Sequence, residues 1–359
     1  MSDEPFWRRP DRLPKAPLPE RVEVLVVGGG ITGVSLLRRL GELGVRAALV
    51  ERTHLAFGAS GRNAGFLLEG TAANYAEAAR LHGGAMAGEI WAFTAENHRR
   101  LAESLAGRAG YRRGGSLTLA ASPDEERQLA EAAELMNTEG WPVEFADGSV
   151  LNPRDGELDP AAAVAALAAD CPPGSTFEET AVISLKALPI AADEVVLATN
   201  AFTGQLLEGV PIAPVRAQML ATAPFATRVA ERPTYSDRGY RYWRQLPGGE
   251  VLAGGFRDRA VEEEVGYELV TTRVIQGHLE RHLAELGVGA PVTHRWAGTM
   301  GFTPDSLPLV GRLRPGLSIC AGYTGHGMAF AHLCARALAD HLAGGPPPPK
   351  WLDPARFPE

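Results

Sequence analysis

The hydrophobic pattern of the chain begins with an unbroken, mostly apolar run. Residues 22–27, VEVLVV, have the composition of a strand that lies buried inside a parallel sheet. The apolar positions that follow recur at helical spacing until Gly44: Ile31, Val34, Leu37, Leu40 and Leu43. A second run, RAALVE at residues 46–51, predicts another strand. The chain therefore opens with the order strand, helix, strand that is typical of a βαβ unit.

Helical periodicity dominates the next hundred residues. Residues 76–106 carry apolar side chains that predict one long amphipathic helix over the sheet: Met86, Ile90, Phe93, Leu101 and Leu105. Ser122 and Glu125 have the spacing of a capping box, which predicts a second helix that ends at Gly140. A third helix is expected over residues 159–169, where Asp-Pro supplies the start signal.

The second half of the chain contains strand patterns of two kinds. ADEVVLATNAFTG, at residues 192–204, predicts a buried strand that leads into a turn of small residues. Residues 211–255 contain several strand-like segments without helices between them, which predicts an antiparallel sheet. A helix over residues 271–286 is expected to cover that sheet. The chain then returns to βα order, with a strand at 316–322 and a helix at 328–342.

These elements together predict an α/β protein. A Rossmann-like dinucleotide-binding domain is expected to be interleaved with an α+β substrate domain built on the antiparallel sheet. The dinucleotide-binding domain is assigned residues 1–75, 171–210 and 296–345. The substrate domain is assigned residues 76–170, which are largely helical, and 211–295, and a proline-rich tail follows at 346–359.

Composition and charge narrow the class of protein. The 359 residues are 45% hydrophobic and 22% charged, which is ordinary for a globular chain. The formal net charge of −8 provides no basic face for a nucleic acid. No window approaches the length of apolar sequence that a membrane span requires. The N-terminal residues 1–20 are polar and proline-rich and lack the apolar core of a signal peptide, so we expect a cytoplasmic protein.

Metal chemistry has little support in the sequence. Cys171, Cys320 and Cys334 form no C-x-x-C pattern, and reduced, buried thiols are the expectation. His278 and His282 are four residues apart on a predicted helix, but the glutamate of a H-E-x-x-H motif is missing. No metal site is expected.

The first glycine turn carries the clearest chemistry. Gly28, Gly30 and Gly33 fit G-x-G-x-x-G and stand between the first strand and its helix, where backbone N–H groups can hold a pyrophosphate. Glu51, at the end of the second strand, can accept hydrogen bonds from ribose hydroxyls and would repel the 2′-phosphate of NADP. NAD and FAD both remain open at this point.

A later glycine turn favours FAD. In GYTGHGMAF, Gly325, His326 and Gly327 stand at the start of the last predicted helix. The positive end of that helix would stabilise the negative charge of a reduced flavin, whereas a nicotinamide carries no such charge. An ordinary glycine-rich loop with a surface histidine is the alternative.

A series of motifs, in order along the chain, resembles one family. The motifs are VLVVGGGITG, GASGRNAG, VVLATNAFT, YWRQLPGGEVLAGG, WAGTMGFTPDSLPLVG and GYTGHGM. With them the chain resembles the D-amino-acid-oxidase-like superfamily of FAD-dependent amine and amino-acid oxidoreductases. Within it, the chain resembles the branch of gamma-glutamylputrescine oxidoreductase, glycine oxidase and sarcosine oxidase.

The resemblance implies a set of residues that bind FAD. The ADP half would be held by Gly28, Gly30, Ile31, Thr32, Gly33, Glu51 and Arg52. The pyrophosphate and flavin would lie along Ser60, Arg62, Asn63, Ala64 and Gly65, and along Ala198, Thr199 and Asn200. The pyrimidine edge of the flavin would meet Gly325, His326, Gly327 and Met328. Val182 corresponds to the adenine site, but the strand hairpin that usually follows it in relatives is trimmed here.

The resemblance also implies a reaction. A hydride would pass from a substrate carbon to flavin N5, an imine would form and hydrolyse, and O₂ or another acceptor would reoxidise the flavin. FAD is expected to be non-covalent, because AGTMGFTPD lacks the linking cysteine of sarcosine-oxidase relatives. We expect hydride transfer from a neutral amine or amino acid without an essential enzymic base. The candidate catalytic or substrate-facing residues are Arg62, Tyr242, Arg244 and His326.

Two of these candidates have alternatives. Arg244 is equally compatible with a position on the protein surface. Tyr242 and Trp243 must face opposite sides of their strand, and we favour Tyr242 as the one that faces the pocket. Two other functions are also open. One is a FAD-dependent 2-hydroxy-acid dehydrogenase, and the other is a flavoprotein component of a larger or tRNA-modifying assembly. The oligomeric state is left undetermined.

Overall fold

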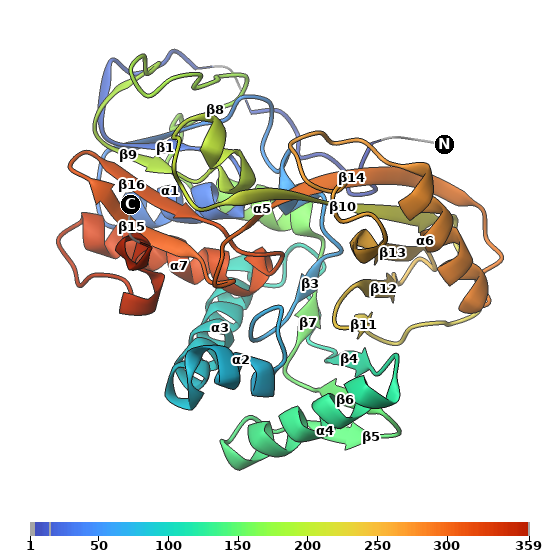
Figure 1. The fold of residues 1–359 in the computed structure, drawn as a ribbon. Helices are drawn as coiled ribbons and strands as arrows, with labels where there is room; N and C mark the ends of the chain where they lie inside the picture. Colours follow the sequence, from blue (N-terminus) through green and yellow to red (C-terminus); the bar gives the residue numbers. More distant parts are fainter. Residues whose placement is uncertain (1–3, 14–15, 358–359) are drawn as a thin grey trace.

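The computed structural model describes residues 4–13 and 16–357 and contains two large sheets (Figure 1). The first has six strands in the order β15-β16-β9-β1-β2-β8. Their bounds are β1 Arg21–Val27, β2 Ala47–Val50, β8 Thr176–Phe177, β9 Ala191–Leu197, β15 Leu309–Arg314 and β16 Leu317–Ala321. The strands are parallel except for β15, which pairs antiparallel with β16. The βαβ start is confirmed, because α1 (Ile31–Glu42) joins β1 to its parallel neighbour β2.

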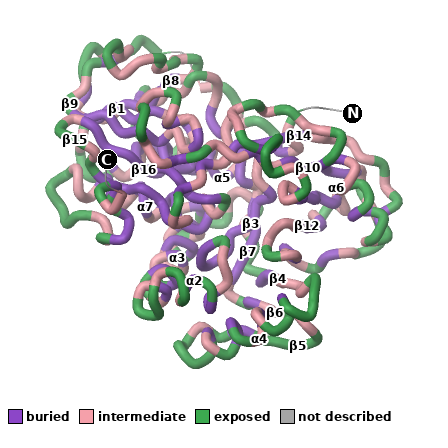
Figure 2. The backbone as a smooth tube through the Cα atoms, in the orientation of Figure 1, coloured by how far each residue is buried: buried purple, intermediate pink, exposed green. Residues whose placement is uncertain are grey.

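The six-stranded sheet is buried on both faces, as its apolar strands predict. Val24 and Val26 of β1 pack on the side of α1 and α7 (Gly327–Leu342), while Leu25 and Val27 pack into a separate core on the other side. Buried residues concentrate around this sheet and α7 (Figure 2). The sheet is therefore a rigid support for loops at its carboxyl edge.

The second sheet has eight strands in the order β14-β10-β13-β12-β11-β4-β6-β5. Their bounds are β4 Ser116–Leu119, β5 Glu144–Ala146, β6 Ser149–Asn152, β10 Ala213–Thr222, β11 Thr234–Ser236, β12 Arg241–Gln245, β13 Val251–Gly255 and β14 Val292–Phe302. The pairs are antiparallel apart from β11 with β4. The predicted helix is α6 (Arg273–Glu285), whose Ile275, Leu279 and Leu283 cover one face of this sheet. The mixed α/β fold, with parallel and antiparallel sheets, is thus confirmed.

The remaining elements connect the two sheets. They are the short pair β3 (Phe66–Leu67) and β7 (Gly156–Glu157), and the helices α2 (Tyr75–His82), α3 (Gly84–Leu105), α4 (Pro123–Thr138) and α5 (Pro160–Ala169). Short 3₁₀ turns are η1 (Ala59–Gly61), η2 (Asn200–Gln205), η3 (Arg257–Arg259), η4 (Lys350–Leu352) and η5 (Pro354–Arg356). In the described part of the chain, no helix has the length and apolar character needed to cross a membrane.

One predicted helix is wrong in its extent. The single helix expected over residues 76–106 is divided into α2 and α3 at Gly83, whose φ of 88° lies in the left-handed region. Glycine tolerates this conformation and so allows the chain to bend without interrupting the apolar spacing on either side. Half of the predicted capping box is present at the start of α4, where the Glu125 N–H donates to Ser122 Oγ at 3.2 Å. The Glu125 carboxylate accepts from the Ala121 N–H at 2.8 Å instead of from the Ser122 N–H.

Candidate active site

The glycine turn brings the first helix unusually close to the first sheet. A Cβ added to Gly28 would lie 2.7 Å from the Ala198 carbonyl oxygen, and one added to Gly33 would lie 1.9 Å from the Gly28 oxygen. These two glycines are required by backbone packing. Gly30 is different, because an added Cβ would meet only the Ser60 side chain, at 2.9 Å from Oγ. Gly30 has no side chain to cap α1, and the Ile31 N–H donates to Ser60 Oγ at 3.0 Å. The positive end of the helix beside Gly30 suits an anion.

Glu51 is fixed beside this turn by three hydrogen bonds. Its Oε2 accepts from the Gly29 N–H at 2.8 Å, and its Oε1 accepts from the N–H and Oγ1 of Thr53, each at 2.9 Å. The neighbouring Arg52 guanidinium lies 4.4 Å above the Phe202 ring. A fixed carboxylate at the end of β2 is the arrangement that accepts ribose hydroxyls.

A continuous cavity of about 910 Å³ runs from the glycine turn to the eight-stranded sheet. Most of the predicted cofactor residues line it: Gly28, Gly30, Ile31, Thr32, Glu51, Arg52, Ser60, Arg62, Asn63, Ala64, Val182, Ala198, Thr199, Asn200, Gly325, His326, Gly327 and Met328. Residues from six separate segments are thus brought together. Val182 is included although no strand lies between β8 and β9, where relatives were expected to carry a hairpin.

Gly33 and Gly65 do not line the cavity, which corrects their expected direct contact with a ligand. Gly33 packs against the Gly28 carbonyl oxygen, where an added Cβ would clash. Gly65 has a φ of 77°, and a Cβ there would lie 2.2 Å from the Leu158 carbonyl oxygen. Both glycines therefore allow close backbone packing behind the cavity wall.

The loop before β3 is held from several sides. Asn63 donates from Nδ2 to the Ala59 and Ser60 carbonyls at 3.0 and 3.1 Å. The backbone carbonyl of Asn63 accepts from Trp7 Nε1 at 2.7 Å. Arg62 donates from Nε to the Phe57 carbonyl at 2.9 Å and from Nη1 to the Ala297 carbonyl at 3.0 Å. Burial lowers the pKa of Arg62. Its side chain lines the cavity but already has protein partners.

The start of α7 forms the opposite wall. His326 precedes the helix without capping it through its side chain, and its ring stacks on Tyr235 with centroids 6.3 Å apart. Burial lowers the pKa of His326 to about 4, so the ring is neutral at pH 7. Its Nδ1 is buried without a hydrogen-bond partner among the described residues, as is Oγ1 of Thr299 on the same cavity. Such atoms normally have partners, so the cavity wall suits a polar ligand.

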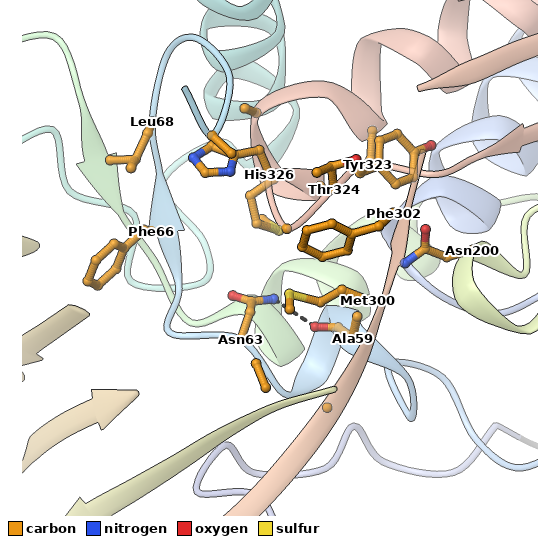
Figure 3. A pocket seen from close by; sticks show the side chains of 18 of the residues that line it. Ala59, Asn63, Phe66, Leu68, Asn200, Met300, Phe302, Tyr323, Thr324 and His326 are labelled. Atoms are coloured by element: carbon orange, nitrogen blue, oxygen red, sulfur yellow. Dashed lines mark hydrogen bonds between the residues drawn. The ribbon is translucent and has the colours of Figure 1, made fainter. Parts of the chain in front are cut away.

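Aromatic and apolar side chains line the part of the cavity near His326. Figure 3 shows Phe66 and Leu68 on one side and Met300 and Phe302 on the other, with His326 between them. The register of the eight-stranded sheet adds a row formed by Thr118, Tyr235, Tyr242 and Met219, all of which line the cavity. This part of the cavity can therefore surround the reactive part of a small molecule and keep water away from it.

Tyr242 is the strand residue that faces the cavity, and Trp243 faces away. The Trp243 ring packs under α6, with its centroid 4.8 Å from that of His282. The Tyr242 ring lies over Gly254, where a Cβ would be 2.3 Å from Cε2. Burial raises the pKa of Tyr242 and of its neighbour Tyr235 above the usual tyrosine value. Both phenols therefore stay protonated near neutral pH and can donate hydrogen bonds.

The structure does not bring Arg244 to the cavity, which corrects its expected contact with substrate. The buried guanidinium forms an ion pair with Glu157, at 2.9 Å between Nε and Oε2. It also donates from Nη1 to the carbonyls of Ala64, Gly65 and Leu158 at 3.0, 3.2 and 2.9 Å. Arg244 thus fastens the loop before β3 to the segment that leads into α5.

Asp155 and Arg257 are two of the charged cavity residues that were not assigned to the site from the sequence. Asp155 is buried and accepts hydrogen bonds from the Glu69 N–H at 2.8 Å and from Ser116 Oγ at 2.6 Å. Burial raises its pKa to about 7. Arg257, just after β13, also lines the cavity. No motif marks Asp155, whereas the strand-ending glycine before Arg257 was a usable signal.

The three cysteines lie away from this cavity. Cys171, Cys320 and Cys334 are free and buried, and burial raises the pKa of Cys171 and Cys320 to about 12. None of the three lines the cavity. Among residues 4–13 and 16–357, no three His, Cys, Asp or Glu side chains gather as metal ligands would.

Several known proteins are similar to this chain. The family model "FAD dependent oxidoreductase" (DAO) matches residues 23–341. The MnmC protein of Maricaulis maris, named for tRNA 5-methylaminomethyl-2-thiouridine biosynthesis, is 29% identical over 90% of this chain. The chain spans about half (52%) of that protein's length. Gamma-glutamylputrescine oxidoreductase of Escherichia coli is 26% identical, over 90% of this chain and 84% of its own. The solved glycine oxidase of Geobacillus kaustophilus superposes with a TM-score of 0.79 at 19% identity, covering 95% of this chain and all of its own.

Proposed function

Because the chain belongs to the DAO family of FAD-dependent oxidoreductases, we propose that it oxidises the C–N bond of an amino acid or a small amine. FAD is the cofactor of the family, and we propose that this chain holds it non-covalently. The cavity has no cysteine in its wall, and His326 is its only histidine among the described residues. That histidine is neutral and lies beside the helix end.

The residues present fit FAD along the whole cavity. The N-terminus of α1, with Gly30, suits the pyrophosphate, and Glu51 suits a ribose. The start of α7, with its positive dipole and the unpartnered Nδ1 of His326, suits the polar edge of an isoalloxazine. Bound there, FAD would supply the hydride acceptor, and the protein would supply orientation and electrostatics.

The side chains around the reactive end would position a neutral amine. Phe66, Leu68 and Met300 exclude water, while the protonated phenols of Tyr235 and Tyr242 can donate hydrogen bonds. We propose that the amine loses its proton to solvent before the C–H bond breaks, so that no side chain is an essential base. Water then hydrolyses the imine to a carbonyl compound and an amine or ammonia.

One observation carries this proposal. A single cavity joins an anion-binding helix start, a second helix start with an unpartnered histidine nitrogen, and the aromatic face of the antiparallel sheet. The test is anaerobic mixing of the FAD-loaded protein with panels of amino acids, amines and 2-hydroxy acids. We expect flavin bleaching with C–N compounds. Bleaching by hydroxy acids alone would support the 2-hydroxy-acid dehydrogenase instead.

A second candidate function follows from the Maricaulis maris relative. Its name assigns it to tRNA modification, so a flavoprotein role in a tRNA-modifying assembly is open for this chain. The net charge of −8 weighs against direct tRNA binding. A tRNA gel shift at low salt distinguishes the two: binding would favour the assembly role, and its absence together with bleaching by free amines would favour the small-molecule enzyme. O₂ or another electron acceptor would reoxidise the reduced flavin.

A further inference from the structure

Residues 4–13 form a strap on the outer side of the loop that precedes β3. Trp7 is the one buried residue of this strap, with 7% of its surface exposed. Its Nε1–H donates to the Asn63 carbonyl at 2.7 Å. Phe6 packs edge-on against the Trp7 ring and against His294 of β14, with ring centroids 5.5 Å apart in each pair. Trp7 is thus held between the loop and the eight-stranded sheet.

The other end of the strap is tied to the start of the same loop through Glu178. The Leu13 N–H donates to Glu178 Oε2 at 3.2 Å. The Leu55 N–H donates to Oε1 of the same carboxylate at 2.8 Å. Because Trp7 binds the loop at Asn63 and Glu178 joins the strap to Leu55, the strap is connected to both ends of the loop.

The end of this loop is fastened by its backbone carbonyls. Side chains donate hydrogen bonds to the carbonyls of four consecutive residues: Arg62, Asn63, Ala64 and Gly65. The donor is Trp296 for the first carbonyl, at 2.9 Å, Trp7 for the second, and Arg244 for the last two, at 3.0 and 3.2 Å. None of these three donors lines the cavity, so the four carbonyls point away from it. The partial negative charge of the carbonyl oxygens is thereby kept away from the space that suits a pyrophosphate.

Trp7 differs from the other two donors in the element that carries it. Trp296 belongs to β14 and Arg244 to β12, so both are fixed by the eight-stranded sheet. Trp7 comes from a strap whose other residues are half-buried or exposed. The Arg244 Cζ lies 5.5 Å from the Trp7 ring centroid, a cation–π contact that supports the guanidinium. Trp7 therefore acts on one of the four carbonyls directly and on two through Arg244.

We infer that Trp7 is a positioning residue for FAD. Its hydrogen bond to the Asn63 carbonyl and its ring contact with Arg244 hold the loop in the shape that lines the cavity. Arg62, Asn63 and Ala64 of this loop form part of the cavity wall, where the pyrophosphate and the flavin are expected. With the loop released, FAD would have to order it on binding, and this ordering costs free energy. The inference rests on the proposed binding of FAD in this cavity, but not on which bond the flavin oxidises.

The test compares two variants of Trp7 with a matched variant elsewhere. Trp7→Phe keeps a ring against Arg244 but removes the N–H donor, and Trp7→Leu removes both. Trp243→Phe is the control, because Trp243 is buried to a similar degree, at 5% exposure, in the separate core beneath α6. Titration of each apoprotein with FAD gives the Kd. The rise in flavin fluorescence after dilution of the FAD-loaded protein gives the rate of FAD release.

Trp7→Phe should raise the Kd for FAD by roughly three- to tenfold, the effect expected for one lost hydrogen bond, and should speed FAD release. Trp7→Leu should raise the Kd by roughly ten- to a hundredfold, because Arg244 also loses its ring contact. Trp243→Phe should lower the resistance of the protein to urea but leave the Kd and the release rate unchanged. An unchanged Kd in Trp7→Phe, or an equal rise in Trp243→Phe, would overturn the inference.

Amide hydrogen exchange of the loop is a second readout, and it requires neither substrate nor turnover. In the apoprotein, the peptide that contains residues 59–65 should exchange faster in Trp7→Phe than in wild type, whereas the peptide that contains α6 should not. Bound FAD should remove most of this difference. If the wild type binds no FAD, the proposed function fails, and the exchange of residues 59–65 still decides whether Trp7 holds the loop. If the wild type binds FAD but Trp7→Phe changes neither the exchange nor the Kd, only the inference about Trp7 fails.

Discussion

The close contact between Gly254 and Tyr242 predicts the effect of a single added methyl group. In Gly254→Ala, the new Cβ would lie 2.3 Å from Cε2, 2.4 Å from Cζ and 2.6 Å from Oη of Tyr242. Ordinary contacts between such atoms are about 3.5–4.0 Å, so the ring must move by more than about 1 Å. The backbone cannot separate easily, because Tyr242 and Gly254 are paired in register between β12 and β13.

The ring can move only among other cavity residues. Its centroid is 5.8 Å from that of Tyr235 and 6.2 Å from that of Phe66. We expect overpacking to lower the free energy of unfolding by about 1–3 kcal/mol. FAD should still bind, since no residue of the glycine turn changes. Flavin reduction should slow by roughly tenfold to a hundredfold, because a displacement of about 1 Å is enough to misplace a reacting group.

The assay combines urea unfolding of the FAD-loaded protein with anaerobic flavin reduction. Gly277→Ala is a matched control, since no atom lies within 4 Å of its added Cβ in α6, and alanine should stabilise that helix by about 1 kcal/mol or less. In a Tyr242→Ala background, Gly254→Ala should cost almost nothing further. If the stability loss were the same with and without the Tyr242 ring, or if reduction were unchanged, our assignment of this contact would be wrong.

Three further changes test other parts of the site. Gly30→Val should abolish FAD binding, because its side chain would meet Ser60 Oγ and enter the space that suits the pyrophosphate; a normal flavin spectrum in this variant would contradict that placement. Acid precipitation of the holoprotein should release all of the flavin into the supernatant, and flavin left in the pellet would disprove non-covalent binding. Asp155→Asn tests whether burial raises the pKa of the Asp155 carboxyl. Because burial raises the folded-state pKa of Asp155 from 3.8 to about 7, wild-type stability should fall as pH rises from about 4 to 7 and then level off. The variant lacks this loss, so its advantage in urea unfolding should grow from pH 5 to pH 8, by at most about 3 kcal/mol. An advantage that does not change with pH would contradict the raised pKa, and loss of flavin reduction with FAD and substrate still bound would make Asp155 the essential base that we do not expect.

The parts of the fold that the sequence predicts are those set by local patterns. The strands β1 and β9 end in the apolar runs VLVV and VVL. The helices α1 and α4 have helical periodicity, and they begin at a glycine turn and at the Ser122 cap, respectively. The break at Gly83 could not be predicted from local patterns, because the apolar spacing continues on both sides of it. A glycine is required there by its φ, but nothing in the local sequence separates this glycine from one that a helix tolerates.

The polar residues of the site show a different limit. Alternation along β12 places Tyr242 and Arg244 on the same face, yet only Tyr242 reaches the cavity. Arg244 instead forms an ion pair with Glu157 of β7, a residue that is distant in the chain. Asp155 and Arg257 reach the cavity through loop geometry that no periodicity describes. The glycine-turn end of the cavity was predictable because its motifs are local, whereas the end beside the eight-stranded sheet is assembled from long-range contacts.

The central claim is that this cavity supports oxidation of a C–N bond, and a single anaerobic turnover measures it directly. The FAD-loaded protein is reduced by a limiting amount of the best bleaching compound, and the products are quantified against the flavin reduced. We predict about one carbonyl compound and one amine or ammonia released per reduced flavin, with reduction slowed by deuterium on the carbon next to nitrogen. Flavin reduction without release of an amine or ammonia would contradict the claim.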